Sequence, residues 1–252
     1  MAGPVKAKKH LGQHFLRNEQ IAIQIVNALD IDLNSKVLEI GPGDGVLSKH
    51  LLERFTDIQL LDIDDESIAY LKAEFPIHRD KVIHQDFLKL NISESVFVIG
   101  NFPYNISSQI VFKILENRVC VLGMVGMFQK EVAERIAAPP GSRTYGILSV
   151  LTQAFYKVDY LFSVDEHCFE PPPKVKSGVL KMMRKEQIEL NCDERMFFSI
   201  VKRAFNQRRK MIRKSLKDLI PENGDKSIED YLTMRPEQLG FEDFIVLTRA
   251  LS

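Results

Sequence analysis

Short apolar runs and amphipathic segments alternate between Ile21 and Gln129. The apolar runs are rich in β-branched and aliphatic residues and recur roughly every twenty residues, as Val37–Ile40, Ile58–Leu61, Val82–Ile83 and Val96–Ile99. The segments with helical spacing are Val46–Phe55, Glu66–Phe75 and Ser107–Asn117, and Val121–Phe128 follows as a further strand. This alternation predicts an α/β fold with a parallel, Rossmann-like sheet covered by helices on both faces.

The pattern changes after this region. Tyr156–Val164 and Gly178–Met183 are predicted as two more strands, with the proline-rich sequence Phe169–Pro173 as a rigid loop between them, because proline cannot continue a strand ladder. After about Lys185 the spacing becomes helical. The predicted helices are Asp193–Leu219, Ser227–Leu232 and Glu242–Leu251, with Pro221 and Pro236 as breaks.

A chain of 252 residues is long enough for one large or two small domains. We predict a first domain at residues 1–185, which holds the sheet, and a small all-helical domain at residues 186–252. The apolar run Val119–Val125 is far shorter than the roughly 20 residues of a membrane span, and the N-terminus has no apolar signal segment. The three cysteines are widely spaced, which fits a reducing cytoplasm. We therefore expect a cytoplasmic protein with no membrane association.

The charges are unevenly distributed although the net charge is zero. Residues 202–217 contain eight Lys or Arg and no acid, and Lys6, Lys8, Lys9 and Arg17 are unopposed near the N-terminus. A solvated helix face usually mixes both signs, so the one-sign segment favours a nucleic-acid contact. On a continuous helix, Lys210 and Lys214 would share a side with Lys217, while Arg209 and Arg213 would form the adjacent row.

A glycine-rich turn follows the first predicted strand, in the sequence Glu39-Ile40-Gly41-Pro42-Gly43-Asp44-Gly45. Glycine at a strand-to-helix turn lets the backbone approach a ligand closely. Asp62 ends the second strand, where a carboxylate can accept hydrogen bonds from ribose hydroxyls, and Asp86 ends the third, where it can bond an adenine amine. Together these positions predict an adenosyl ligand at one edge of the sheet. The alternative is that the glycines only make a turn and the aspartates only cap helices.

The sequence Asn101-Phe102-Pro103-Tyr104 directly follows the fourth strand. The N6 amine of adenine is a poor nucleophile because its lone pair is delocalised into the ring. Acceptors for both amine hydrogens favour a pyramidal nitrogen, and the Asn101 side-chain oxygen and the Phe102 carbonyl are candidates. Tyr104 offers a face for base stacking, which is worth ~1–3 kcal/mol per base. The motif therefore predicts methylation of adenine N6 through alignment and electrostatic stabilisation, with simple turn chemistry as the alternative.

Several segments together give the chain a close resemblance to the ribosomal RNA adenine N6,N6-dimethyltransferases, specifically the bacterial small-subunit (16S) enzymes. The segments are Leu11–Leu16, Glu39–Gly45, Gly100–Ser107, Gln129–Arg135, Tyr145–Gly146, Phe169–Val175 and Ala204–Leu216. The resemblance runs nearly end to end. It implies S-adenosylmethionine as the cofactor, and dimethylation of two adjacent adenines in the 3′-terminal hairpin of 16S rRNA. It also implies a role in small-subunit biogenesis.

The resemblance also implies roles for individual residues. His14 and Leu16 help to hold the methionine end of the cofactor, with Gly41 against it, Asp62 at the ribose, Asp86 at the cofactor adenine and Asn101 at the methyl-transfer site. Gln13, Gly43, Ile63 and Phe87 complete the expected cofactor site. Phe169 is expected to stack on the target adenine opposite Tyr104. Three positions depart from the commonest family pattern: His14 replaces Asn, Asp62 replaces Glu and Phe102 replaces Leu.

The expected partner is 16S rRNA within the small ribosomal subunit or its precursor, bound by a monomer. The RNA-contacting residues are expected to be Arg208, Arg209, Lys210, Arg213 and Lys214, interleaved with apolar residues that anchor the helix. The histidines show no metal-ligand spacing, so we expect no metal. Two alternatives remain open: a DNA adenine N6-methyltransferase, and a non-catalytic RNA-binding assembly factor. A DNA enzyme usually carries a distinct target-recognition domain, whereas only about sixty residues follow the α/β core here.

Overall fold

The computed structural model describes residues 5–221 and 226–252. The chain divides into two compact units. The first unit comprises Met1–Ala133 and Asp159–Arg184, and the second comprises Glu134–Val158 and Lys185–Ser252. Within the described ranges, no helix is both long enough and apolar enough to span a membrane.

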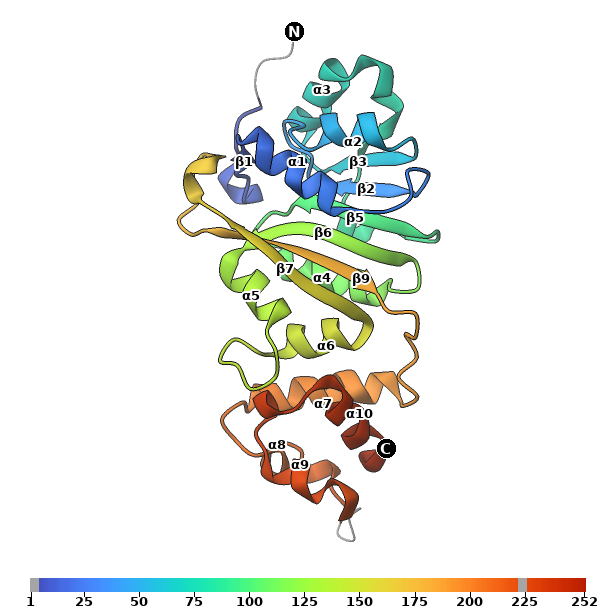
Figure 1. Ribbon diagram of the computed structural model, residues 1–252, viewed down its shortest axis with the longest axis vertical. Helices are drawn as coiled ribbons and strands as arrows, with labels where there is room; N and C mark the ends of the chain where they lie inside the picture. The colour runs from blue at the N-terminus through green and yellow to red at the C-terminus, as the bar shows by residue number, and fades with distance from the viewer. Residues whose placement is uncertain (1–4, 222–225) are drawn as a thin grey trace. The chain divides into compact units, whose positions relative to one another are not determined.

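A seven-stranded sheet with the order β4-β3-β2-β5-β6-β9-β7 forms the centre of the first unit (Figure 1). The strands are β2 (Val37–Ile40), β3 (Ile58–Asp62), β4 (Val82–His84), β5 (Val96–Asn101), β6 (Val121–Gln129), β7 (Tyr156–Val164) and β9 (Ser177–Arg184). Strands β2 to β6 pair in parallel, whereas β9 runs antiparallel to β6. The strand order reverses between β2 and β5. Ligands of open α/β sheets bind at the carboxyl ends of the strands beside such a reversal.

Helices cover the sheet of the first unit; the last three of them lie where the periodicity predicts, whereas the first was not predicted. They are α1 (Glu19–Ala28), α2 (Ser48–Arg54), α3 (Asp65–Glu74) and α4 (Ser107–Glu116), with short 3₁₀ turns at Lys9–Leu11, Pro76–Lys81, Phe87–Lys89 and Glu166–Cys168. All four residues of β2 are buried, as expected for a strand covered on both faces. Asp64 is the N-cap of helix α3, and its side chain accepts a hydrogen bond from the Glu66 backbone N–H.

A two-stranded sheet ties the N-terminal segment to the proline-rich loop. Strand β1 (Phe15–Leu16) pairs antiparallel with β8 (Phe169–Glu170), and the Arg17 backbone N–H donates to the Cys168 carbonyl at 2.7 Å. Sequence periodicity gave no sign of this pairing, because each strand has only two residues. The pairing holds residues 11–16 beside the carboxyl ends of the main strands.

The second unit is mainly helical and also includes the first residues of β7. Its helices are α6 (Ile147–Phe155), α7 (Glu194–Asn206), α8 (Ile212–Ser215), α9 (Glu229–Thr233) and α10 (Phe241–Leu251), with 3₁₀ turns at Lys217–Leu219, Lys226–Ile228 and Pro236–Gln238; α5 (Lys130–Ala137) runs from the first unit into it. Ring contacts join Tyr145 to Phe205 and Phe155 to Phe198. Residues 134–158 therefore pack with the C-terminal helices, whereas the division at residue 185 predicted from sequence placed them in the first domain.

The prediction of one continuous helix over Asp193–Leu219 is wrong. Helix α7 ends at Asn206, and the chain turns through residues 207–211 before α8 begins. The Lys210 N–H bonds the Gln207 carbonyl at 2.7 Å, and the Ile212 N–H bonds the Met234 carbonyl at 2.8 Å. The turn lets Ile212 become fully buried beside α9. The two rows of cations predicted on one helix therefore do not exist, because residues 208–210 lie in the turn.

Candidate functional site

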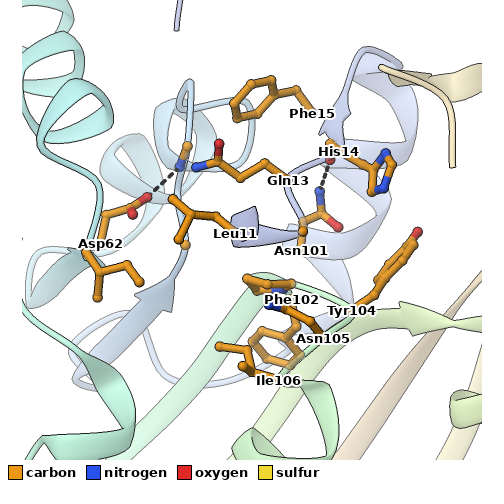
Figure 2. A pocket seen from close by; sticks show the side chains of 15 residues that line it. Leu11, Gln13, His14, Phe15, Asp62, Asn101, Phe102, Tyr104, Asn105 and Ile106 are labelled. Atoms are coloured by element: carbon orange, nitrogen blue, oxygen red, sulfur yellow. Dashed lines mark hydrogen bonds between the residues drawn. The ribbon is translucent and has the colours of Figure 1, made fainter. Parts of the chain in front are cut away.

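A pocket lies at the carboxyl ends of β2, β3 and β5, beside the N-terminal segment (Figure 2). Its lining includes nine residues proposed from the sequence, namely Gln13, His14, Gly41, Gly43, Asp62, Ile63, Asn101, Phe102 and Tyr104. Leu11, Gly12, Phe15, Pro103, Asn105 and Ile106 complete the lining. The structure thus brings the glycine turn, the Asp62 carboxylate and the Asn101–Tyr104 sequence into one cavity.

The glycine turn needs glycine for two different reasons. Gly41 and Gly43 have φ angles of +65° and +59°, in the left-handed region that other residues rarely adopt. A Cβ on Gly43 would also lie 2.7 Å from the Phe15 ring, whereas a Cβ on Gly41 would meet nothing closer than 3.8 Å, at the Pro103 ring. Backbone conformation alone therefore demands glycine at position 41, and close packing of the N-terminal segment demands it as well at position 43.

The Asp62 carboxylate braces this turn from the end of β3. Its side chain accepts hydrogen bonds from the backbone N–H groups of Gly43 at 3.2 Å and Asp64 at 2.9 Å, and the residue is 6% exposed. Burial raises the pKa of Asp62, and the backbone N–H bonds oppose that rise. Each carboxylate oxygen has a second lone pair, so the group can hold the turn and still accept a further donor from the pocket.

Asn101 is held in one orientation at the end of β5. Its side-chain Nδ2 donates to the backbone carbonyl of His14 at 2.8 Å, so its amide oxygen faces the other way, toward the rings of Tyr104 and His14 (Figure 2). The next side chain, Phe102, is 1% exposed and lies edge-on against Phe128. A Cβ on Gly126 would lie 2.2 Å from the Phe102 ring, so a glycine makes room for it. Only the backbone of Phe102 is therefore available to the pocket.

The Tyr104 side chain is held by contacts at its hydroxyl and at its ring. Its hydroxyl lies 2.5 Å from the hydroxyl of Ser177 on β9, and its ring stacks on the His14 ring with centroids 5.4 Å apart. Burial raises the pKa of Tyr104, and the Ser177 bond partly opposes this rise, so the phenol stays neutral at physiological pH. Ser177 was not identified from sequence. Only the antiparallel register of β9 on β6, which pairs it with Gln129, brings it to Tyr104.

The N-terminal segment is anchored to the first unit by charged and polar side chains. Lys8 forms an ion pair with Asp64 and a second one with Glu66 at 3.3 Å. The Gln13 side chain accepts from the Lys8 backbone N–H at 2.8 Å and donates to Asp64 at 3.3 Å. Burial by itself would raise the pKa of Asp64, but the bonds from Lys8 and Gln13 hold it below its ordinary value. Lys8 therefore acts within the first unit as a structural cation, beside the pocket.

Four residues proposed for the site do not line the pocket. Leu16, Phe87 and Phe169 are 1%, 4% and 4% exposed, and Leu16 and Phe169 belong to the hydrophobic core. The Asp86 side chain accepts from the Leu88 N–H at 2.9 Å, which is helix capping, the alternative left open from sequence. The stacking role of Phe169 and the cofactor-binding roles of Leu16, Asp86 and Phe87 stay predictions.

The five cations proposed to bind RNA have different surroundings in the second unit. The Arg208 guanidinium donates to the carbonyl of Arg143 at 2.7 Å, and Arg213 pairs with Glu229 at 2.9 Å. Arg209, Lys210 and Lys214 are exposed, and no ion pair with another described residue is found for them. Across residues 5–221 and 226–252, no group of three or more His, Cys, Asp or Glu is placed to hold a metal ion.

Comparisons with known proteins agree with this geometry. A family model described as ribosomal RNA adenine dimethylase matches residues 5–237. The ribosomal RNA small subunit methyltransferase A of Flavobacterium johnsoniae is 56% identical and covers 98% of this chain and 96% of its own length. A dimethyladenosine transferase from Plasmodium falciparum has a TM-score of 0.82 at 30% identity, covering 93% of this chain and 96% of that one. The 23S rRNA methyltransferase ErmE, with a TM-score of 0.76 at 24% identity, covers 93% and 99% and shares the fold. The expected α/β methyltransferase fold is confirmed.

Proposed function

The chain belongs to the ribosomal RNA adenine dimethylase family and is an rRNA adenine dimethyltransferase that uses S-adenosylmethionine, and we propose that its substrate is 16S rRNA in the small ribosomal subunit or its precursor. The target is two adjacent adenines in the 3′-terminal hairpin, each dimethylated at N6. The modification accompanies small-subunit biogenesis in the bacterial cytoplasm, and the enzyme acts as a monomer. The name of the Flavobacterium johnsoniae relative supports the small-subunit assignment.

The orientation of Asn101 carries the catalytic part of this proposal. Its Nδ2 is bound to the His14 carbonyl, so its oxygen is free to accept a hydrogen from the target amine. The Phe102 backbone carbonyl is the second acceptor. With both amine hydrogens held, the nitrogen lone pair turns out of the ring conjugation and toward the methyl group. The surrounding residues act by alignment and electrostatic stabilisation, and no general base is required before the nitrogen becomes cationic.

The residues at the glycine turn fit S-adenosylmethionine, which supplies an electrophilic methyl group when bound. Gly41 leaves open space above the turn, since a Cβ there would meet only Pro103. Asp62 binds the ribose hydroxyls with its remaining lone pairs, and Ile63, 47% exposed beside the pocket, offers an apolar surface to the adenine. Gln13 and Gly43 line the same pocket, and Asp86 and Phe87 follow shortly after the end of β4.

RNA binding in the second unit rests on three of the five proposed cations, which are exposed and have no ion pair with another described residue. Arg209, Lys210 and Lys214 are free to contact phosphates, while Arg208 holds the Arg143 carbonyl and Arg213 holds Glu229. Each phosphate contact releases counterions and makes affinity salt-dependent. This reduces the five residues proposed from sequence to three principal contacts and two anchoring residues.

Transfer of labelled methyl groups to undermethylated small subunits tests the proposal, with nucleoside analysis of the product. We expect N6,N6-dimethyladenosine in 16S rRNA. Large subunits and duplex DNA serve as controls. Labelling of DNA instead would establish a DNA methyltransferase. Binding to small subunits without methyl transfer, although S-adenosylmethionine binds, would establish a non-catalytic assembly factor.

A further inference from the structure

Ser177 is a polar residue at a buried position of β9. Its side chain is fully buried, as are those of Val179 and Leu180 in the same strand. Buried strand positions of this kind usually hold apolar β-branched or aromatic residues. A buried hydroxyl costs free energy unless it is hydrogen-bonded. Among the described residues, the partner of the Ser177 hydroxyl is the hydroxyl of Tyr104, at 2.5 Å. The contact with Tyr104 therefore accounts for a serine at this position.

Two hydrogen bonds hold Tyr104, one at its backbone and one at the far end of its ring. The Ser107 hydroxyl, at the start of α4, donates to the Tyr104 backbone carbonyl at 3.1 Å and holds the turn. This backbone bond leaves the ring free to rotate about its side-chain torsions. The Ser177 hydroxyl restricts that rotation, because it binds the atom of Tyr104 that lies farthest from the backbone. Tyr104 lines the pocket and Ser177 does not, so Ser177 acts through the tyrosine.

We propose that Ser177 is a positioning residue that holds the Tyr104 ring where the target adenine stacks, and that the second methyl transfer to each adenine depends on it most. The inference rests on the proposed function, in which Tyr104 stacks on the target base. Asn101 ends β5, and Tyr104 follows it in the same turn and borders the same pocket (Figure 2). The position of the ring therefore sets where the base lies relative to the Asn101 oxygen.

The two methyl transfers differ in the number of hydrogens on the target nitrogen. In each transfer a nitrogen–methyl bond forms, the sulfur–methyl bond of S-adenosylmethionine breaks to leave a thioether, and the nitrogen then releases one proton to solvent. The unmodified amine has two hydrogens, one for the Asn101 oxygen and one for the Phe102 carbonyl. The monomethylated amine has one, so one of these bonds is lost. Stacking on Tyr104 then contributes more to alignment, and a misplaced ring slows the second transfer more than the first.

Ser177→Ala removes the hydroxyl that holds the ring. Single-turnover methylation of undermethylated small subunits, at saturating S-adenosylmethionine, gives a rate for each transfer. We expect the first transfer to slow about 2- to 12-fold, the effect of one lost hydrogen bond. The second transfer should slow more, so that N6-monomethyladenosine accumulates in nucleoside analysis. The S-adenosylmethionine Kd, measured by calorimetry, should be unchanged.

Ser163→Ala is the matched control. The Ser163 hydroxyl lies 2.7 Å from the hydroxyl of Tyr160, so the two residues form a second serine–tyrosine pair in the first unit, on β7. Neither residue lines the pocket. This variant loses the same kind of hydrogen bond and should leave both transfer rates unchanged.

Tyr104→Phe and the double variant with Ser177→Ala separate positioning from stability. Each single variant leaves one buried hydroxyl without its partner, which destabilises the fold, whereas the double variant removes both hydroxyls. Urea unfolding should therefore show the double variant to be at least as stable as either single variant. Its second transfer should nevertheless stay as slow as in Ser177→Ala, because nothing holds the ring.

Three outcomes would refute these statements. Equal slowing of both transfers in Ser177→Ala, or no slowing, would overturn the proposal. Recovery of the second transfer together with stability in the double variant would also overturn it, because Ser177 would then serve only the packing of the fold. Absence of methylation of small subunits by the unaltered enzyme would instead refute the proposed function, and with it this inference.

Discussion

Glu39 is a buried acid whose protonation should control the stability of the first unit. It lies in β2 directly before the glycine turn, is 1% exposed, and accepts a hydrogen bond from the Ser48 hydroxyl at 2.7 Å. Burial raises the pKa of Glu39 from 4.5 to about 8; the Ser48 bond opposes this, and the nearby charges of Asp62 and Asp44 add to it. Glu39 is therefore protonated in the folded protein at neutral pH.

The direction of the pH effect follows from proton binding. Between pH 4.5 and about 8, unfolded Glu39 is ionised while folded Glu39 keeps its proton. The unfolded state then binds fewer protons, so this residue lowers the free energy of unfolding as pH rises, by up to about 1.4 kcal/mol per pH unit. Below pH 4.5 both states are protonated, and the effect vanishes. Above pH 8 it reaches its full value, at most on the order of 5 kcal/mol.

Glu39→Gln tests this reasoning, because the Gln amide resembles a protonated carboxyl and does not titrate. We expect the variant to match the original protein near pH 4.5 and to exceed its free energy of unfolding progressively up to pH 8. Urea unfolding followed by circular dichroism suits the assay, since the protein has no tryptophan. Glu19→Gln is the control. Lys49 and His50 lower the pKa of Glu19, so its stabilising contribution is lost as pH falls. A stability difference between Glu39→Gln and the original protein that stays constant over this pH range would refute the reasoning.

Three further predictions concern the site and the RNA contacts. Asn101→Ala should lower kcat on the order of 10²-fold at saturating cofactor, as for other lost polar stabilisers, and near-normal turnover would exclude Asn101 as an acceptor. Asp62→Ala should raise the S-adenosylmethionine Kd roughly 10-fold, the effect of a lost charge-assisted bond of ~1.5–3 kcal/mol, and calorimetry checks this. Arg209→Ala with Lys214→Ala should reduce the salt slope of RNA binding by about two, one per phosphate contact, whereas the ion-paired Arg213→Ala should change it less. Equal slopes in all three proteins would contradict that assignment.

The sequence predicted the parts of the molecule that local pattern governs. The buried strands from β2 to β6 were expected because their apolar runs are short, regular and separated by amphipathic helices. The glycine turn, Asp62 and Asn101 were expected together because parallel strands end at one edge of a sheet. The pocket contains all three.

Other features depended on contacts between residues far apart in the chain. Nothing local marks the end of α7 at Asn206, because Ile212 has the spacing of a continuous helix; its burial beside α9 decides the break. Ser177 reaches Tyr104 only through the register of β9, and residues 134–158 pack with the C-terminal helices through side chains such as Phe155. Local periodicity reports which face of an element is apolar. It does not report which distant segment covers that face, and this is why only the tertiary structure placed His14 against Tyr104.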